Sequence, residues 1–216
     1  MSVTRLPKRL SRLSPLFAVA LFAAGCGGTQ VVSSEGNGTK VTAAVGIENV
    51  VFGAIEVREH QRLAHDLYDQ FARIHVEQAF RLARDARRQN IDSLGRLLRN
   101  RDSFAPAAIL PRGEFDDPGL AAEYKRLLAI GSESEAAAFR VGALLEERDA
   151  AMVRGYGRET AASDVTALYS RLERTNRAHL STFVTHLRTM GEHYNPATGR
   201  VTDVQAMLEA QAEDKD

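Results

Sequence analysis

The stretch that decides the fold is RLARDARRQNIDSL, residues 81–94. It lies in a helical pattern over residues 76–100, in which apolar residues recur in steps of three and four, the spacing of one face of an α-helix. The apolar positions of this face are Val76, Phe80, Ala83, Leu94 and Leu97. Arg87 and Asn90 lie in the middle of the same face. The sequence therefore predicts a helix whose core-facing side carries a cation and an amide at its centre.

Three further long segments have the same periodicity, and no segment after residue 46 has the alternation of a β-strand. Two of these helices are predicted over 47–74 and 163–190. The other is predicted to start at the capping-box signature Ser132-x-x-Glu135 and to run to about Arg154. Each predicted helix carries polar residues in the middle of its apolar face. These residues are Gln61, then Arg87 and Asn90, then Glu146 and Asp149, then Asn176 and His179. Similar depth on four helices predicts a polar layer across the core; the alternative is that some of these side chains lie at the edge of the face and meet water.

The order of the predicted helices indicates the fold. A connection of about thirty residues, with three prolines and a short helix near 119–129, separates the second long helix from the third. Two helix pairs joined by one long crossover is the connectivity of ferritin-like bundles. We therefore predict an all-α protein, a ferritin-like four-helix bundle with one long crossover between helices 2 and 3. Gly191 is expected to stop the fourth helix, and a last short helix is expected near Thr202.

Five segments of the chain resemble a known family. They are REHQRLAHDLY (58–68), GEFDDPGLAAEYKRLLAIGSES (113–134), VGALLEERD (141–149), NRAHLSTFVTHL (176–187) and GEHYNP (191–196). They follow one another in the order found in a ferritin-like family of unknown function, the domain of unknown function 2202. This resemblance implies a four-helix ferritin-like fold and says nothing direct about activity.

The residues of a ferritin-like di-metal site are largely missing. Such a site needs a Glu from each of two helices and Glu-x-x-His from each of the other two, because four carboxylates offset two dications. The corresponding positions here are Gln61, the pair Arg87 and Asn90, Glu146, and the pair Asn176 and His179. Only one carboxylate and one imidazole remain, and Glu-x-x-His does not occur in the chain. The sequence therefore predicts a bundle without a di-metal site and without a cofactor.

We expect Arg87 to cross the bundle and pair with Glu146, in the space that two metal ions would fill. A guanidinium suits this position because it stays charged and presents five donors in a planar fork. The remaining hydrogen bonds are expected from Gln61, Asn90, Asn176 and His179. The alternative is that Arg87 extends along the helix to solvent.

Two other chemistries use the same core residues. His65, Glu146 and His179 could converge on a single transition-metal ion, which would make the chain a metal-binding or redox protein. The alternative is that His65 lies at the surface and His179 is a hydrogen-bonded core residue. Glu146 and His179 could also form an acid–base pair, but no nucleophile or substrate pocket is recognisable. A non-enzymatic binding or scaffolding module is therefore the predicted class.

The N-terminus predicts a lipid anchor. Four basic residues precede the apolar run PLFAVALFAA (15–24), which is too short to span a bilayer and reads as a signal peptide. The following Ala-Gly-Cys resembles the bacterial lipobox, in which the cysteine is acylated and becomes the first residue. We predict a signal peptide at 1–25, acylated Cys26 with a flexible tether at 26–46, and a folded domain at 47–216. The alternative is a plain secretory signal.

The net charge of the predicted mature chain limits the classes of partner that we expect. Removing the four basic residues of the signal peptide from the 28 of the chain leaves 24 against 28 acidic residues, which gives no reason to expect nucleic acid. Gly27 after the cysteine implies sorting to the outer membrane, facing the periplasm, in a Gram-negative cell. Residues 76–101 hold seven arginines and three acids, and Arg81, Arg84 and Arg88 share a face. This face is either solvated or in contact with anionic lipid. The sequence GYGR (155–158) is predicted to be a loop.

Overall fold

The computed structural model describes residues 38–101 and 110–196, with only the backbone described for residues 38–48. This part of the chain contains five α-helices and no strand, and it belongs to one compact unit. The helices are α1 (Gly38–Ile74), α2 (Gln78–Arg99), α3 (Pro118–Ser132), α4 (Glu135–Arg158) and α5 (Ser163–Thr189). The predicted signal peptide, Cys26 and the helix expected near Thr202 lie outside the described residues. Within the described residues, none of the helices is both long enough and apolar enough to cross a bilayer.

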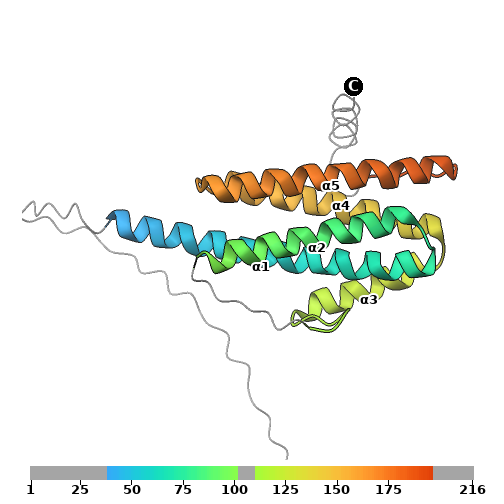
Figure 1. Ribbon diagram of the computed structural model, residues 1–216, viewed down its shortest axis with the longest axis horizontal. Helices are drawn as coiled ribbons and strands as arrows, with labels where there is room; N and C mark the ends of the chain where they lie inside the picture. Colours follow the sequence, from blue (N-terminus) through green and yellow to red (C-terminus); the bar gives the residue numbers. More distant parts are fainter. Residues whose placement is uncertain (1–37, 102–109, 197–216) are drawn as a thin grey trace, which may run out of the picture. The chain divides into compact units, whose positions relative to one another are not determined.

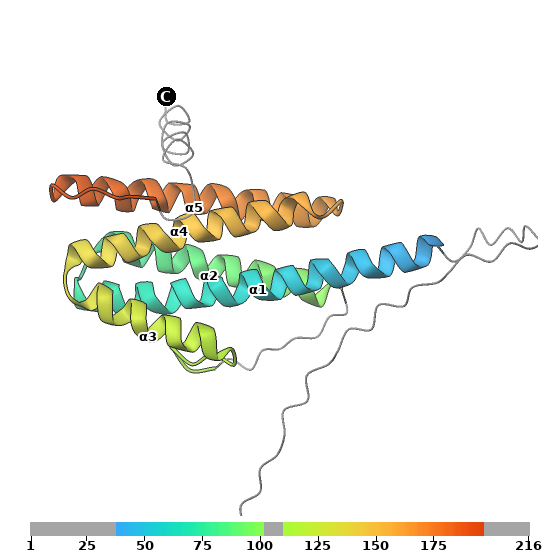
Figure 2. The ribbon, with the colours of Figure 1, turned by 180° about the vertical axis from the view of Figure 1, so that it is seen from behind.

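The long helices pack as two hairpins (Figures 1 and 2). A short turn joins α1 to α2, another joins α4 to α5, and the most extensive packing is within these two pairs. Further contacts join α1 to α4 and α2 to α5, while α3 lies against α1 and α4. The prediction of an all-helical bundle is confirmed, and the connection from α2 to α4 is the long one that contains α3.

The first two helices begin at other residues than predicted, although α1 ends at Ile74 as predicted and α2 ends within one residue of the prediction. Because α1 begins at Gly38, residues 38–46 belong to a helix and not to the tether. No proline interrupts these residues, so their Gly and Thr content does not prevent a helix. Val76 lies in the turn before α2 with φ +61°, and its side chain is 68% exposed. The chain reversal between the two helices thus removes Val76 from the apolar face.

The ends of α4 were also predicted wrongly. The N-cap is Ser134, whose hydroxyl accepts from the Ala137 amide at 3.1 Å, while Ser132 ends α3 and donates to the Leu128 carbonyl. At its other end α4 continues through GYGR, because Tyr156 packs against Gly53 of α1 and donates to Glu56. Tertiary packing outweighs the low helix propensity of two glycines.

The end of α5 agrees with the prediction. Gly191 follows the C-cap with φ +76°, a left-handed conformation that glycine adopts without strain. The amide of Glu192 donates to the Leu187 carbonyl at 2.9 Å, which satisfies a terminal carbonyl of the helix. Met190, the C-cap residue, is exposed.

The apolar core consists of two separate clusters of buried side chains. On α1 one cluster takes residues 50–57 and the other takes residues 63–72, with Gln61 between them. On α2 the clusters take residues 79–83 and 94–98, and on α5 they take residues 165–172 and 180–187. The predicted polar positions therefore separate two apolar clusters, as a layer across the bundle requires.

Two glycines test how closely the helices pack. An added Cβ on Gly131 of α3 would lie 2.2 Å from the Phe71 ring of α1, whereas Gly155 of α4 has no atom within 4 Å of such a Cβ. We expect Gly131→Ala to lower the free energy of unfolding by about 1–3 kcal/mol through overpacking. Gly155→Ala should raise it by about 0.5–1 kcal/mol, because alanine costs less backbone entropy. Urea unfolding followed by circular dichroism measures both, and equal effects would contradict the close contact between α1 and α3.

Candidate functional site

The candidate site is the polar layer between the two apolar clusters. Six of the seven predicted layer residues are at most 5% exposed. They are Gln61 on α1, Arg87 and Asn90 on α2, Glu146 and Asp149 on α4, and Asn176 on α5. Each lies on the core-facing side of its helix because it follows the three- and four-residue steps of the apolar residues around it. Four helices therefore bring these side chains to one level of the core.

Arg87 is the centre of the layer. Its Nη2 donates to Glu146 Oε2 at 2.6 Å, and its Nη1 donates to Asp149 Oδ2 at 2.7 Å. The side chains of Arg87 and Glu146 are fully buried, so the arginine does not reach solvent. The predicted ion pair between α2 and α4 is confirmed, and Asp149 adds a second carboxylate that the sequence had not paired with Arg87.

Further hydrogen bonds extend the layer in two directions. Gln61 Nε2 donates to Asp149 Oδ2 at 3.3 Å, and Asn90 Nδ2 donates to Gln61 Oε1 at 3.0 Å. On the other side, the Tyr68 hydroxyl donates to Glu146 Oε1 at 2.8 Å. Tyr68 is not among the residues predicted for the layer. Its place seven residues after Gln61, two helical turns along the same face, is the signal that could have assigned it to the layer.

Asn176 and His179 do not supply the hydrogen bonds predicted for them. Neither amide atom of Asn176 has a hydrogen-bond partner among the described residues, although the side chain is fully buried. His179 Nδ1 lies 3.3 Å from Glu146 Oε1 without the alignment of a hydrogen bond, and its side chain is 16% exposed. Helical spacing predicts the face on which a side chain lies but not whether that side chain meets a partner in hydrogen-bonding geometry.

The two carboxylates of the layer have opposite pKa shifts. Burial raises the pKa of Glu146, but the Arg87 guanidinium, with smaller contributions from His179 and Tyr68, lowers it more, so that the net pKa is below the usual 4.5. Burial also raises the pKa of Asp149, and there Arg87 does not fully compensate, so that the net pKa is above 3.8. Burial and the neighbouring Glu146 carboxylate raise the pKa of Tyr68, which keeps its hydroxyl a donor. Glu146 is thus the more firmly ionised partner of Arg87.

These directions predict how the folded chain titrates. The ionised Glu146 contributes stability above its unfolded pKa of 4.5, and this contribution is lost as the pH falls through its lowered folded pKa. Asp149 acts in the opposite sense, because the folded chain binds its proton more readily than the unfolded chain does. We expect carboxyl ¹³C NMR to show Asp149 titrating above 3.8 and Glu146 below 4.5. The reverse order of shifts would contradict the assignment of Glu146 as the main partner of Arg87.

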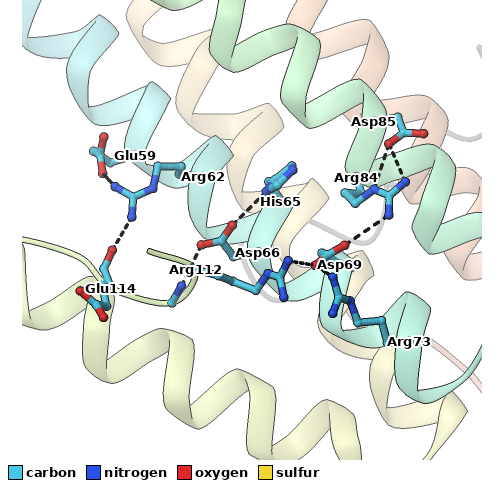
Figure 3. Close-up of polar contacts among 11 residues, drawn as sticks. Glu59, Arg62, His65, Asp66, Asp69, Arg73, Arg84, Asp85, Arg112 and Glu114 are labelled. Carbon is cyan, nitrogen blue, oxygen red and sulfur yellow. Dashed lines mark hydrogen bonds and ion pairs between the residues drawn. The ribbon is translucent and has the colours of Figure 1, made fainter. Parts of the chain in front are cut away.

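The alternative metal ligands are not brought together. His65 Nδ1 lies 2.9 Å from Asp66 Oδ1, on the side of α1 that faces the connection before α3 (Figure 3). In the described ranges, no three His, Cys, Asp or Glu side chains are grouped as metal ligands, so His65, Glu146 and His179 do not form such a set.

A second polar cluster lies near the turn between α1 and α2 (Figure 3). The carboxylate of Asp69 on α1 is almost buried and pairs with Arg73 at 3.2 Å, Arg84 at 3.2 Å and Arg112 at 2.5 Å. Arg84 also pairs with Asp85 at 2.8 Å. Two of these arginines come from elements other than α1, so the cluster fastens α2 and the connection before α3 to it.

The ion pairs of this cluster reduce the number of arginines on the predicted basic face of α2 that are available to a ligand. Arg84 is engaged by two carboxylates, and Arg81 donates to the Val76 carbonyl at 3.1 Å. Arg88 is exposed. Contact of this face with anionic lipid stays a prediction, with Arg88 the least engaged of the three.

The fold and the site together define an all-helical bundle whose buried polar layer is an arginine between two carboxylates. The chain belongs to the family described as an uncharacterized protein domain (DUF2202), which it matches over residues 51–211. It is 30% identical over 144 residues to the uncharacterized protein MJ0754 of Methanocaldococcus jannaschii, a match that spans 67% of this chain and 78% of that protein. The crystal structure of hypothetical protein MJ0754 from Methanococcus jannaschii has a similar fold, with a TM-score of 0.71 and 27% identity, over 74% of this chain and 91% of that one.

Proposed function

We propose that the chain is a lipid-anchored envelope protein whose ferritin-like four-helix bundle has exchanged its di-metal site for a charged side-chain layer, and that it acts as a binding or scaffolding module. The observation that carries this proposal is the position of Arg87, fully buried between Glu146 and Asp149 at the centre of the bundle. Four long helices in two hairpins, joined by a long connection that contains α3, support the ferritin-like arrangement.

The charge balance explains how such a core is stable. A di-metal layer balances four carboxylates with two dications, and carboxylates without the ions would each cost several kcal/mol to bury. Here two of those carboxylate positions hold the neutral amides Gln61 and Asn176, and a third holds Arg87. The guanidinium supplies one positive charge and two short hydrogen bonds, one to Glu146 at the fourth position and one to Asp149, one turn along α4. The chemistry of this layer supports a structural role in place of a redox role.

The lipid anchor rests on the sequence before the described residues. Four basic residues, an apolar run and small residues directly precede Cys26, the one cysteine of the chain. Acylation of its thiol would place the bundle at a membrane surface in the cell envelope.

Mass spectrometry of the mature N-terminus tests the anchor. We expect a diacylglyceryl-modified Cys26 as the first residue of the wild-type chain, and an unprocessed precursor or a mis-sorted protein after Cys26→Ser. Substitution of Ser33, which is in the same predicted tether, by alanine is the matched control and should leave processing unchanged. An unmodified N-terminus that starts at another residue of the wild-type chain would refute the anchor.

A further inference from the structure

A polar groove of about 310 Å³ lies between α2 and α5. This volume is at the lower end of the range for small-molecule sites, about 300–1,000 Å³. Its lining comes from residues 86–96 of α2 and from Arg171 and Thr175 of α5. The groove therefore opens where the two hairpins meet, at the level of the polar layer.

Asn90 connects the groove to the buried layer. The side chain is only 5% exposed, yet it is part of the groove lining. Its amide nitrogen donates to Gln61, and no described group donates to its carbonyl oxygen. This oxygen is not one of the buried side-chain atoms that lack a partner, so it is accessible from the groove, and its hydrogen-bonded amide group offers a fixed acceptor there.

Two arginines on different helices line the same groove. Arg96 of α2 donates to Ser93 Oγ at 2.9 Å and pairs with none of the described carboxylates. The Arg171 guanidinium of α5 makes no hydrogen bond or ion pair with another described residue, whereas the Arg171 backbone carbonyl accepts from Thr175 Oγ1 at 3.1 Å. Asp92 is the one acid in the lining. Two guanidiniums with free donors and one carboxylate favour a ligand that has an anionic end and a hydrogen-bond donor.

We propose that this groove binds a small phosphate ester that also carries a hydroxyl or ammonium group. Arg96 and Arg171 hold the phosphate from the two sides of the groove, while Asp92 and the Asn90 carbonyl oxygen accept from the donor group. Phosphate suits the arginines because its oxygens match the planar fork of a guanidinium. The ligand is either a free phosphate ester or the headgroup of a phospholipid, since both have this chemistry. The proposal gives the binding module proposed above a ligand class, and it rests on that function.

Calorimetric titration tests the groove directly. The full chain with Cys26→Ser, which removes the acylated thiol, is titrated with O-phosphoethanolamine and, separately, with inorganic phosphate. We expect O-phosphoethanolamine to bind more tightly than inorganic phosphate, because only it can also donate to Asp92 and Asn90. Replacing both Arg96 and Arg171 with glutamine should weaken binding by roughly tenfold or more. Arg188→Gln, an exposed arginine of α5 outside the groove, is the matched control and should leave the affinity unchanged.

Co-sedimentation with phosphatidylethanolamine vesicles identifies the source of the ligand. Vesicle binding that is lost in the double variant assigns the headgroup of a lipid, and titration with the free ester alone assigns a soluble ligand. The proposal is overturned if neither probe binds, or if the double variant binds as tightly as the wild type. That result would not contradict the proposed lipid anchor, which mass spectrometry tests, or the role of the charged layer, which unfolding measurements test.

Discussion

Replacing Arg87 with methionine should lower the free energy of unfolding by about 3–5 kcal/mol, the usual cost of removing one partner of a buried ion pair. The loss belongs at the upper end of this range because the guanidinium is fully buried and holds both Glu146 and Asp149. Methionine fills a similar volume, so the effect is one of charge and not of a cavity. Urea unfolding followed by circular dichroism at neutral pH measures it.

An arginine of the same helix provides the control. Arg84 pairs with Asp69 and Asp85, but its side chain is partly exposed and two other arginines also pair with Asp69. Arg84→Met should therefore cost no more than about 1 kcal/mol. Equal losses in the two variants would show that the buried position of Arg87 has no special importance.

Removing the carboxylates should reverse most of the loss caused by Arg87→Met. Adding Glu146→Leu to Arg87→Met still leaves Asp149, so this double variant is expected to recover only part of the stability. The further change Asp149→Asn removes the last charge and keeps an acceptor for Gln61 Nε2. The triple variant should approach the wild type, because replacing a whole buried ionic cluster by neutral groups is often nearly neutral. Additive losses across the three substitutions would contradict the network.

Replacing Phe80 with alanine should lower the free energy of unfolding by about 3–5 kcal/mol. Its ring lies at the centre of an aromatic group contributed by all four long helices. The neighbouring ring centres are those of Phe139 at 4.7 Å, Phe183 at 5.4 Å, Phe71 at 5.5 Å and Tyr68 at 6.1 Å. Rings from four helices cannot all move inward to fill the space that one of them leaves, so a cavity remains.

Leu82, two residues along α2, is the matched control for Phe80. It is 59% exposed, and Leu82→Ala should change the stability by no more than about 0.5 kcal/mol. Thermal or urea unfolding of the two variants distinguishes the cavity effect from a change in helix propensity. A loss below about 1 kcal/mol for Phe80→Ala would contradict the packing described here.

The four long helices and their buried faces could be predicted from the sequence because helical periodicity is a local signal that extends over many residues. Helix ends depend on single residues and their tertiary contacts, and these were predicted less well. The pair Ser132 and Glu135 satisfied the spacing of a capping box, yet Ser134 caps α4. Tyr156 holds a Gly-containing segment in helical form through contacts with α1, which no local pattern shows.

The centre of the site could also be predicted, because a buried arginine requires a carboxylate and Glu146 occupies the matching position of α4. The other ion pairs and hydrogen bonds of the polar layer could not be predicted. Asp149 is one turn of α4 from Glu146, and only the position of α2 shows that one guanidinium reaches both. Asn176 lies on the core-facing side of α5, as predicted, but its amide group has no hydrogen-bond partner among the described residues. Helical periodicity does not show whether a short side chain will meet a partner on another helix.

The metal content of the purified full chain tests the central claim most directly, namely that side-chain charges and not ions hold the core together. Elemental analysis before and after dialysis against EDTA is combined with the melting temperature of each sample. The account predicts much less than one transition-metal ion per chain and an unchanged melting temperature, because Arg87 already supplies a positive charge to both Glu146 and Asp149. One or two ions per chain, with a large fall in melting temperature when they are removed, would contradict it.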